Sequence, residues 1–298
     1  MSGHRMSIVA AVLAAVVVGG CADYTRQAGA ERGLIVVLPG VQGPDGLSSD
    51  IRRGLIDAGV DRAVVVQPWG KPIPIAGVVL NQVDFLGARV SASAIADAVA
   101  AYQKAYPGRP VHIIGHSAGG ALAVFVAESL ASNRQGQPID GLVLLSASIS
   151  SGYDLTKALG MCRSGILNCY NPDDVALLGV GTAILGNLDG GHGASAGRSG
   201  FHSPDSENAS TESLGAYARL AQHTVTSGGS AHFAATSPGF VAEVPASWIM
   251  SSPSAPPAQA ASPSLPAASP AEMPAPPAPP QPHVVRPDQW LPVAPGGS

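Results

Sequence analysis

Charged and aromatic residues are scarce in this sequence, and cysteine occurs only three times. Of the 298 residues, 12% are charged and 5% are aromatic, and the formal net charge is −4. The 16 lysines and arginines form no basic stripe, which argues against a nucleic-acid partner. Cys21, Cys162 and Cys169 form neither a CxxC pair nor a cluster with histidine at zinc spacing, so the sequence predicts no zinc site.

The N-terminal segment has the features of an export signal. A short polar and basic start leads into an apolar run over 6–18, which is shorter than the roughly twenty apolar residues that span a bilayer. Two glycines then precede Cys21 in an arrangement that resembles a bacterial lipobox, in which the cysteine is lipidated. We therefore predict a signal peptide over 1–20, a membrane anchor at Cys21, a flexible tether over 21–32 and a location in the bacterial cell envelope. An ordinary signal peptide, with Cys21 a bystander, is the alternative.

The segment 251–298 differs in composition from the rest of the chain. It holds 15 of the 27 prolines, interleaved with alanine and serine, and it has almost no charge. Such a stretch buries too little apolar surface to offset its conformational entropy. We expect a disordered tail here, which leaves one folded domain over 33–250.

Within that domain, short apolar runs alternate with stretches of helical character. The runs are continuous and rich in valine, isoleucine and leucine, as expected of strands that are buried on both faces. They are Leu34–Leu38, Ala63–Gln67, Val111–Ile114, Gly141–Leu145 and Ile166–Tyr170. The candidate helices are Leu47–Ala58, Ser91–Ala105, Ala118–Ala131, Tyr153–Leu159 and Gly239–Met250. This alternation predicts the α/β class, with a mostly parallel sheet and helices on both faces.

The most specific motif is Gly115-His116-Ser117-Ala118-Gly119, between a predicted buried strand and a predicted helix. In that context G-x-S-x-G forms a strained strand-to-helix turn that exposes the serine above the sheet. Glycine is needed at both ends because Cβ atoms there would collide. The motif predicts Ser117 as a nucleophile and the amide of Ala118, at a helix N-terminus, as an oxyanion donor.

A second oxyanion donor is expected in the loop after an earlier strand. Pro39-Gly40-Val41-Gln42 follows the first predicted strand, and Gly40 permits a tight turn there. The amide of Val41 or Gln42 then faces the serine, and we favour Val41. A plain Pro-Gly turn is the alternative.

A serine hydroxyl needs a histidine base, and the histidine needs a carboxylate that holds its tautomer. In this order of elements the base follows the serine along the chain. His232 lies in a glycine-rich loop just before the last predicted helix, which favours it. His192 lies in a second glycine-rich loop and is the rival. His202 and His223 lack neighbouring glycines, and we interpret them as surface residues.

Four segments together resemble the α/β-hydrolase superfamily and, more narrowly, bacterial envelope lipoprotein hydrolases within it. They are 38–43, 115–120, 170–174 and 232–241, and the resemblance covers about 33–249. It implies a Ser-Asp-His triad that works without a metal or organic cofactor. The usual lid, over about 147–165, is short, which implies an open site. The glycine-rich stretch 181–210 either overhangs the site or forms a mobile surface loop.

Four aspartates compete as the acid: Asp154, Asp173, Asp174 and Asp189. Asp154 opens a predicted helix, where an acidic side chain interacts favourably with the helix dipole. Asp189 lies in a glycine-rich loop and fits loop ordering or a substrate contact. Asp173 and Asp174 follow a predicted strand, at the sheet edge that carries the serine. The related hydrolases have a Tyr-Ser-x-x-Asp pattern that matches Tyr170 and Asp174, with asparagine here in place of serine, and this favours Asp174.

These residues predict the hydrolysis of a carboxylic ester, with a small ester or a lipid as the substrate. Ser117 attacks, His232 transfers the proton, Asp174 orients the histidine, and the amides of Ala118 and Val41 hold the oxyanion. Two alternatives stay open: a catalytically silent binding lipoprotein with the same fold, and an acyltransferase.

The last two cysteines also leave two interpretations open. Export makes a disulfide between Cys162 and Cys169 possible. Because Cys169 lies on a predicted buried strand, where a free thiol packs well, two free cysteines are the alternative.

Overall fold

The computed structural model describes residues 22–41, 43–70, 84–134, 136–175, 186–205, 207–226 and 230–251. The predicted signal peptide, Cys21, Gln42 and the predicted tail from 252 onward lie outside these residues. The described chain forms one sheet of six parallel strands in the order β2-β1-β3-β4-β5-β6. The strands are β1 (Leu34–Leu38), β2 (Ala63–Val66), β3 (Val111–His116), β4 (Gly141–Leu145), β5 (Ile166–Tyr170) and β6 (Leu220–Thr224).

The five predicted strands form the centre and one edge of this sheet. Their apolar side chains are mostly covered on both faces, which is why the sequence revealed them. Every residue of β1, β3 and β4 is buried. The sixth strand, β6, was not predicted. It lies at the sheet edge with four of its five residues exposed, so it carries no apolar run that would reveal it.

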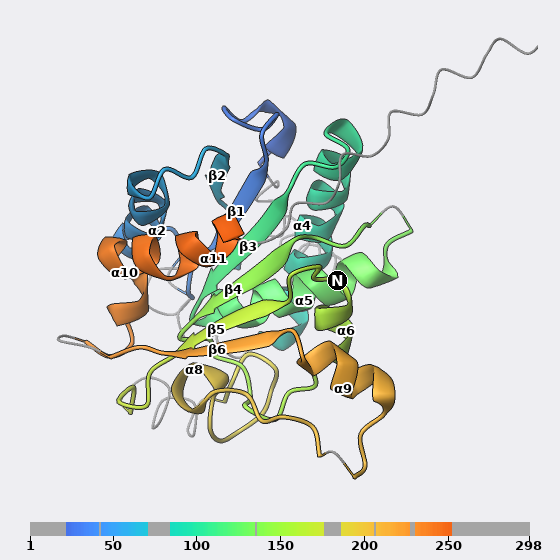
Figure 1. Ribbon diagram of the computed structural model, residues 1–298, viewed down its shortest axis with the longest axis vertical. Coiled ribbons are helices and arrows are strands. Elements are labelled where there is room, and N and C mark those ends of the chain that lie inside the picture. Colours follow the sequence, from blue (N-terminus) through green and yellow to red (C-terminus); the bar gives the residue numbers. More distant parts are fainter. Residues whose placement is uncertain are drawn as a thin grey trace, which may run out of the picture. The chain divides into compact units, whose positions relative to one another are not determined.

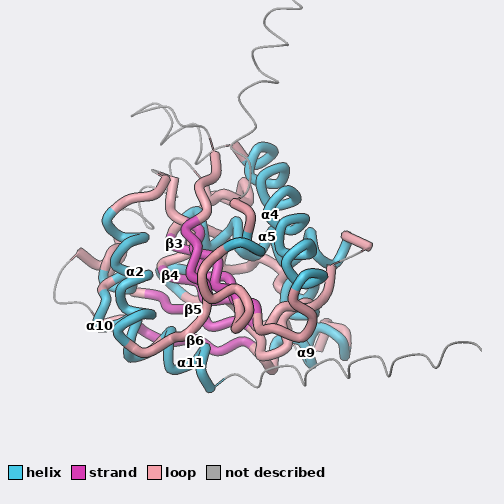
Figure 2. The backbone as a smooth tube through the Cα atoms, turned by 90° about the horizontal axis from the view of Figure 1, so that it is seen from above, coloured by secondary structure: helices cyan, strands magenta, loops and turns pink. Residues whose placement is uncertain are grey.

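Helices cover both faces of the sheet (Figure 1), and the view from above separates the two layers (Figure 2). On one face lie α4 (Phe85–Ala105), α5 (Ala118–Ser132) and α6 (Thr156–Gly160). On the other lie α2 (Gly46–Asp57), α10 (Pro238–Glu243) and α11 (Pro245–Ser251). The predicted α/β class, with a parallel sheet between two helical layers, is confirmed. Shorter elements are η1 (Tyr24–Arg26), α8 (Ala196–Ser199), α9 (Thr211–Tyr217) and η3 (Ala234–Thr236).

Two helix boundaries differ from the prediction for local reasons. Helix α4 begins six residues earlier than expected, where the side chain of Asp84 accepts a hydrogen bond from the amide of Gly87 and caps the first turn. The last predicted helix is two helices, α10 and α11, because Pro245 cannot continue the hydrogen-bond ladder of α10. Within the described residues, no helix has both the length and the apolar character to cross a bilayer.

The segment that follows Cys21 packs on the domain, which corrects the expectation of a flexible tether. The Tyr24 ring is buried, and its hydroxyl donates to Gln67 Oε1 at 3.0 Å. The amide of Ala22 donates to the same oxygen at 3.1 Å. Tyr106 reaches the carbonyl of Thr25 at 2.9 Å. Aromatic side chains and a buried glutamine therefore attach this segment to the domain, so the folded unit begins before residue 33.

The sheet reverses its direction of growth between β1 and β3. The chain leaves β1 toward α2 and the β2 edge, whereas it leaves β3 toward α5 and the β6 edge. At such a switch point the two loops diverge above the carboxyl ends of the strands and leave a crevice between them. Gly40 and Ser117 lie on either side of this point: a Cβ atom at Gly40 would be 3.4 Å from the Cβ of Ser117.

Candidate active site

Ser117 has a strained backbone at the turn between β3 and α5. Its φ of 55° and ψ of −124° are rare for a residue with a side chain. The turn is tight because both motif glycines lie against main chain. A Cβ at Gly115 would be 2.2 Å from the carbonyl oxygen of Gly119, and one at Gly119 would be 2.2 Å from that of Leu38. These two positions therefore require glycine.

Hydrogen bonds to three separate segments hold Ser117 in this conformation. Its amide donates to the carbonyl of Leu145, at the end of β4, at 2.9 Å. Its own carbonyl accepts from the amides of Gly120 and Ser148, both at 2.9 Å. The neighbouring strand, helix and loop thus fix the backbone independently of the side chain, which leaves the hydroxyl available for other contacts.

The side chains of Ser117, His232 and Asp174 form one hydrogen-bonded series, which we call the Ser–His–Asp chain. His232 Nε2 lies 3.1 Å from Ser117 Oγ, and His232 Nδ1 lies 2.5 Å from Asp174 Oδ2. Because the ionised carboxylate only accepts, the network assigns the proton to Nδ1 and leaves Nε2 to accept the serine hydroxyl. His232 and Asp174 are buried, while Ser117 is half-buried. Solvent therefore reaches the series at its serine end.

The other histidines considered from the sequence lie elsewhere. His192, His202 and His223 are all exposed. His223 is on the edge strand β6, where its ring packs 5.7 Å from that of Phe240.

Three of the four aspartates considered from the sequence have other surroundings. Asp154 accepts from the amide of Thr156 at 2.9 Å at the start of α6. Asp189 accepts from the amide of Ser150 at 3.1 Å and so orders a loop. Asp173 is exposed, one residue from the buried Asp174.

The two amides predicted to hold an oxyanion both belong to segments next to Ser117. Ala118 is the first residue of α5, so its N–H is among those that have no partner within the helix. Val41 follows Gly40, which packs against Ser117 and near the His116 ring. Gln42, the other residue considered, lies outside the described residues.

His116 and Asn171 are buried polar residues near the site to which the sequence alone assigned no role. The Nε2 atom of His116 lies 3.4 Å from the carbonyl oxygen of His232, and Asn171 Nδ2 donates to the carbonyl of Ala231 at 3.1 Å. Burial lowers the pKa of His116 to about 3, with a smaller contribution from the neighbouring His232, so this ring stays neutral near pH 7. The sequence signal was present, because both residues flank predicted strands, but their partners were not visible.

The glycine-rich stretch predicted over 181–210 packs on the loop after β4 in its described part. The amide of Leu188 donates to the carbonyl of Ser148 at 3.1 Å, and the amides of Ala196 and Gly197 donate to the carbonyls of Ile149 and Ala147. Leu188 and Ala196 are fully buried. This part of the stretch is therefore a support for the loop after β4 and not a mobile surface loop.

Cys162 and Cys169 are free thiols and do not form the disulfide considered from the sequence. Both are buried, and burial raises the pKa of each to about 12. No group of three or more metal-ligating side chains occurs among the residues the structure describes.

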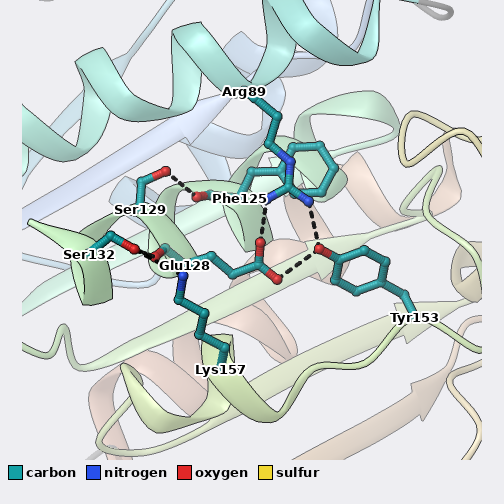
Figure 3. A network of polar contacts seen from close by, with 7 residues as sticks. All are labelled: Arg89, Phe125, Glu128, Ser129, Ser132, Tyr153 and Lys157. Atoms are coloured by element: carbon teal, nitrogen blue, oxygen red, sulfur yellow. Dashed lines mark hydrogen bonds and ion pairs between the residues drawn. The ribbon is translucent and has the colours of Figure 1, made fainter.

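A second polar series lies on the α4–α5 face (Figure 3). Arg89 pairs with Glu128 and donates to the Tyr153 hydroxyl at 2.7 Å, and Tyr153 donates to Glu128 at 2.8 Å. The Arg89 guanidinium lies 3.6 Å from the centre of the Phe125 ring. We call Arg89, Glu128 and Tyr153 the Arg89 cluster. It borders an open groove of about 410 Å³ with Ser93, Asp97, Asn133 and Lys157.

The Arg89 cluster is remote from Ser117. Glu128 lies ten residues after the first residue of α5, which corresponds to about 15 Å along the helix axis. The groove beside the cluster therefore does not open onto the Ser–His–Asp chain.

No protein-family model and no curated protein matches this sequence. Among solved structures, a lipase/esterase from Lactobacillus plantarum is 12% identical over 68% of this chain and 79% of its own, with a TM-score of 0.39. A dienelactone hydrolase from Anabaena variabilis is 11% identical over 74% and 86%, with a TM-score of 0.41. An acetylxylan esterase is 8% identical over 74% and 98%, with a TM-score of 0.43. Likeness of this size carries neither an activity nor a site residue to this chain.

Proposed function

We propose that this protein is a serine hydrolase that cleaves carboxylic esters through Ser117, His232 and Asp174. One observation carries the proposal: a serine with φ of 55° at the N-terminus of a buried helix lies 3.1 Å from a histidine whose other nitrogen lies 2.5 Å from a buried carboxylate. A nucleophile, a base and an orienting acid need this order of contacts. Backbone strain of this kind clusters at functional sites.

The reaction proceeds in two halves. Ser117 Oγ attacks the ester carbonyl carbon while its proton passes to His232 Nε2, and Asp174 stabilises the resulting imidazolium. The oxyanion is held by the amides of Ala118 and Val41. The C–O bond to the alcohol then breaks, and the alcohol leaves with the proton from His232. Water, deprotonated by His232, attacks the acyl-enzyme and releases the acid and the free serine.

An activity-based probe tests this function directly. A fluorophosphonate reacts with an activated serine, so we expect wild-type protein to be labelled at Ser117 and to hydrolyse nitrophenyl esters. Ser117→Ala should lose both properties, whereas Ser129→Ala, on the same helix, should keep them. Absence of labelling in the folded wild type would instead support a silent binding protein. Labelling together with transfer of the acyl group to an added alcohol in preference to water would support an acyltransferase.

The substrate that we propose is a small or lipid ester that is met at the cell envelope. The lipobox-like segment before Cys21 supports export and lipidation. Ala22 and Tyr24 are already bound to Gln67, so a lipid on Cys21 would join the domain with almost no spacer and hold it at the bilayer surface. The test is fractionation: wild type should sediment with membranes and Cys21→Ser should not, and a soluble wild type would contradict the anchor. A panel of esters of graded acyl length would then define the substrate class.

A further inference from the structure

We propose that His116 and Asn171 are positioning residues that clamp the backbone of His232 from both sides, a role that rests on the proposed function. Each of these residues contacts a backbone carbonyl next to the His232 Cα atom. Asn171 donates to the carbonyl of Ala231, and His116 donates to the carbonyl of His232. These carbonyls belong to the two peptide groups on either side of the His232 Cα atom.

Holding both peptide groups sets the direction of the His232 side chain. Each of these planar peptide groups is held by one hydrogen bond from a residue at the end of a strand, which restricts φ and ψ of His232 and therefore the direction of its Cα–Cβ bond. The bond from Asn171 is 3.1 Å, whereas the bond from His116 is longer, at 3.4 Å. Packing supplements the longer bond, because the centres of the His116 and His232 rings lie 5.1 Å apart. The imidazole is thus held both through its backbone and through its ring.

The local chain around His232 needs such support. His232 lies in a single hydrogen-bonded turn over 231–233, outside any strand or α-helix. The regular structure next to it is one short 3-10 helix, η3. Displacement of a catalytic group by about 1 Å can lower turnover about 100-fold. A base carried by this loop therefore depends on contacts from elsewhere in the protein.

Both clamp residues are attached to the rigid part of the fold. His116 is the last residue of β3 and pairs with Leu145 on β4. Asn171 directly follows β5, and its amide donates to the carbonyl of Gly197 at 2.9 Å. Neither residue depends on the loop that it holds.

Asn171 also connects the base to the acid. Its side-chain oxygen accepts from the amide of Asp173 at 3.0 Å, and its carbonyl accepts from the amide of Asp174 at 3.1 Å. The same side chain holds Ala231 through its nitrogen. Asn171 therefore sets the position of the turn that carries Asp174 and of the loop that carries His232, which keeps the 2.5 Å contact between them.

The neutral state of the His116 ring suits its role as a hydrogen-bond donor to the His232 carbonyl. The groups that face it are His232, Asp174 and the Phe233 ring. A neutral ring donates from Nε2 to the His232 carbonyl and adds no positive charge beside His232 when that residue accepts a proton during the reaction.

The chain offers a matched control for each clamp residue. His112 is a second buried, neutral histidine on β3, and Asn168 is a buried asparagine on β5 that donates to the carbonyl of Ala196 at 3.1 Å. We compare His116→Met with His112→Met, and Asn171→Ala with Asn168→Ala. Each pair loses a similar buried polar group, but only the first member of each pair touches the backbone at His232.

We expect the clamp variants to lower kcat for a short nitrophenyl ester by about 10- to 100-fold with KM within twofold. The controls should keep kcat within threefold, even where their melting temperatures fall equally. His116→Gln, whose amide nitrogen can replace Nε2 as the donor, should recover most of the lost kcat. Equal losses of kcat in the clamp variants and their controls, or unchanged kcat in the clamp variants, would overturn the proposal.

Hydrogen exchange provides a readout that does not need the esterase activity. The amides of Phe233 and Ala234 bond to the carbonyl of Ser230 at 3.0 and 3.1 Å within the clamped loop. They should exchange faster in His116→Met than in His112→Met. If wild type lacks esterase activity, the proposed function fails while this comparison still tests the clamp, and equal exchange in the two variants rejects it.

Discussion

The Ser–His–Asp chain and the Arg89 cluster are both three-membered polar networks, but they are built in opposite ways. Ser117, His232 and Asp174 all lie in turns or loops at the carboxyl ends of strands, and the serine carries backbone strain. In the Arg89 cluster, two of the three members lie on the long helices α4 and α5, and none has a positive φ. The first network is a linear series that ends at the half-buried Ser117, whereas the second is a ring, because Arg89, Glu128 and Tyr153 all bond to one another.

This difference shows how each network obtains its geometry. A helix fixes the positions of its side chains by itself, so Arg89 and Glu128 meet wherever α4 and α5 pack. A loop does not fix the positions of its side chains in this way. The members of the Ser–His–Asp chain are therefore held by hydrogen bonds to buried neighbours, such as Ser148 for Ser117 and Asn171 for Asp174. The Arg89 cluster also holds a permanent positive charge. Burial alone would lower the pKa of Arg89, but its bonds to Glu128 and Tyr153 raise it, so this cation persists and stabilises the fold.

Removing the acid of the Ser–His–Asp chain should give the largest effect of the following predictions. Asp174→Asn keeps the shape of the side chain but no longer fixes the His232 tautomer. In serine proteases with this triad, the same change lowers turnover about 10⁴-fold, and we expect a fall of that order here. Ester hydrolysis and thermal unfolding measure the effect, and the melting temperature should change little.

Two neighbouring aspartates provide the controls for this experiment. Asp173→Asn changes an exposed residue one position away, and Asp189→Asn removes the charge of the side chain that accepts from Ser150 but keeps an acceptor oxygen. Both should reduce turnover far less than Asp174→Asn. A larger loss from Asp189→Asn would assign the acid to that residue instead.

Breaking the Arg89 cluster should lower the stability of the protein and leave turnover nearly unchanged, which is the reverse of the result expected for Asp174→Asn. Glu128→Gln leaves Arg89 partly buried over Phe125 without its anionic partner. We expect a loss of about 2–3 kcal/mol in the free energy of unfolding, at or below the range for broken buried pairs because Arg89 keeps some solvent contact. The melting temperature should fall by roughly 4–10 °C, while kcat stays within threefold. A large loss of kcat at unchanged stability would show that the two networks are coupled.

Acid should lower the stability contributed by His116, next to the Ser–His–Asp chain, but not that contributed by Tyr153 in the Arg89 cluster. Burial lowers the pKa of His116 from 6.5 to about 3 in the folded state, so below pH 6.5 the unfolded state binds a proton that the folded state does not. Stability is therefore present above pH 6.5 and falls as the pH drops, by about 2 kcal/mol from this residue between pH 7 and pH 5.

Variants can separate this contribution from the rest of the protein. Urea unfolding at the two pH values should show a smaller acid loss in His116→Gln than in wild type. Tyr153→Phe, in the Arg89 cluster, should leave the acid loss unchanged, because the raised pKa of Tyr153 keeps it neutral throughout this range. An identical acid loss in His116→Gln and wild type would mean that His116 is already protonated in the folded state.

The smallest effect is expected from Tyr153→Phe. The substitution removes the hydroxyl that bonds to both Arg89 and Glu128 but keeps the ring and the ion pair. We expect a loss of about 1 kcal/mol, the net value of a typical hydrogen bond, measured by urea unfolding. A loss as large as that of Glu128→Gln would show that the hydroxyl, and not the charge pair, holds the cluster together.

The class of the fold and the place of the sharp turn at Ser117 follow from local features of the amino-acid sequence. Continuous apolar runs mark strands that are covered on both faces, and the glycines of the Ser117 motif reflect a steric need that is local to five residues. The exposed strand β6 and the true start of α4 carried weaker local signals. The packing of Tyr24 on Gln67 was also invisible, because it depends on residues 43 positions apart.

Which polar residues meet depends instead on the packing of the whole chain. Asp174 and His232 are 58 residues apart, and Ser117 and His232 are 115 apart. Their contact depends on the strand order, which places the ends of β3 and β5 close together, and on the loop that returns after β6. His116 and Asn171 have no local feature that reveals their partners. A hydrogen bond between distant residues requires both backbones to be in place, and the packing of the whole sheet sets those positions.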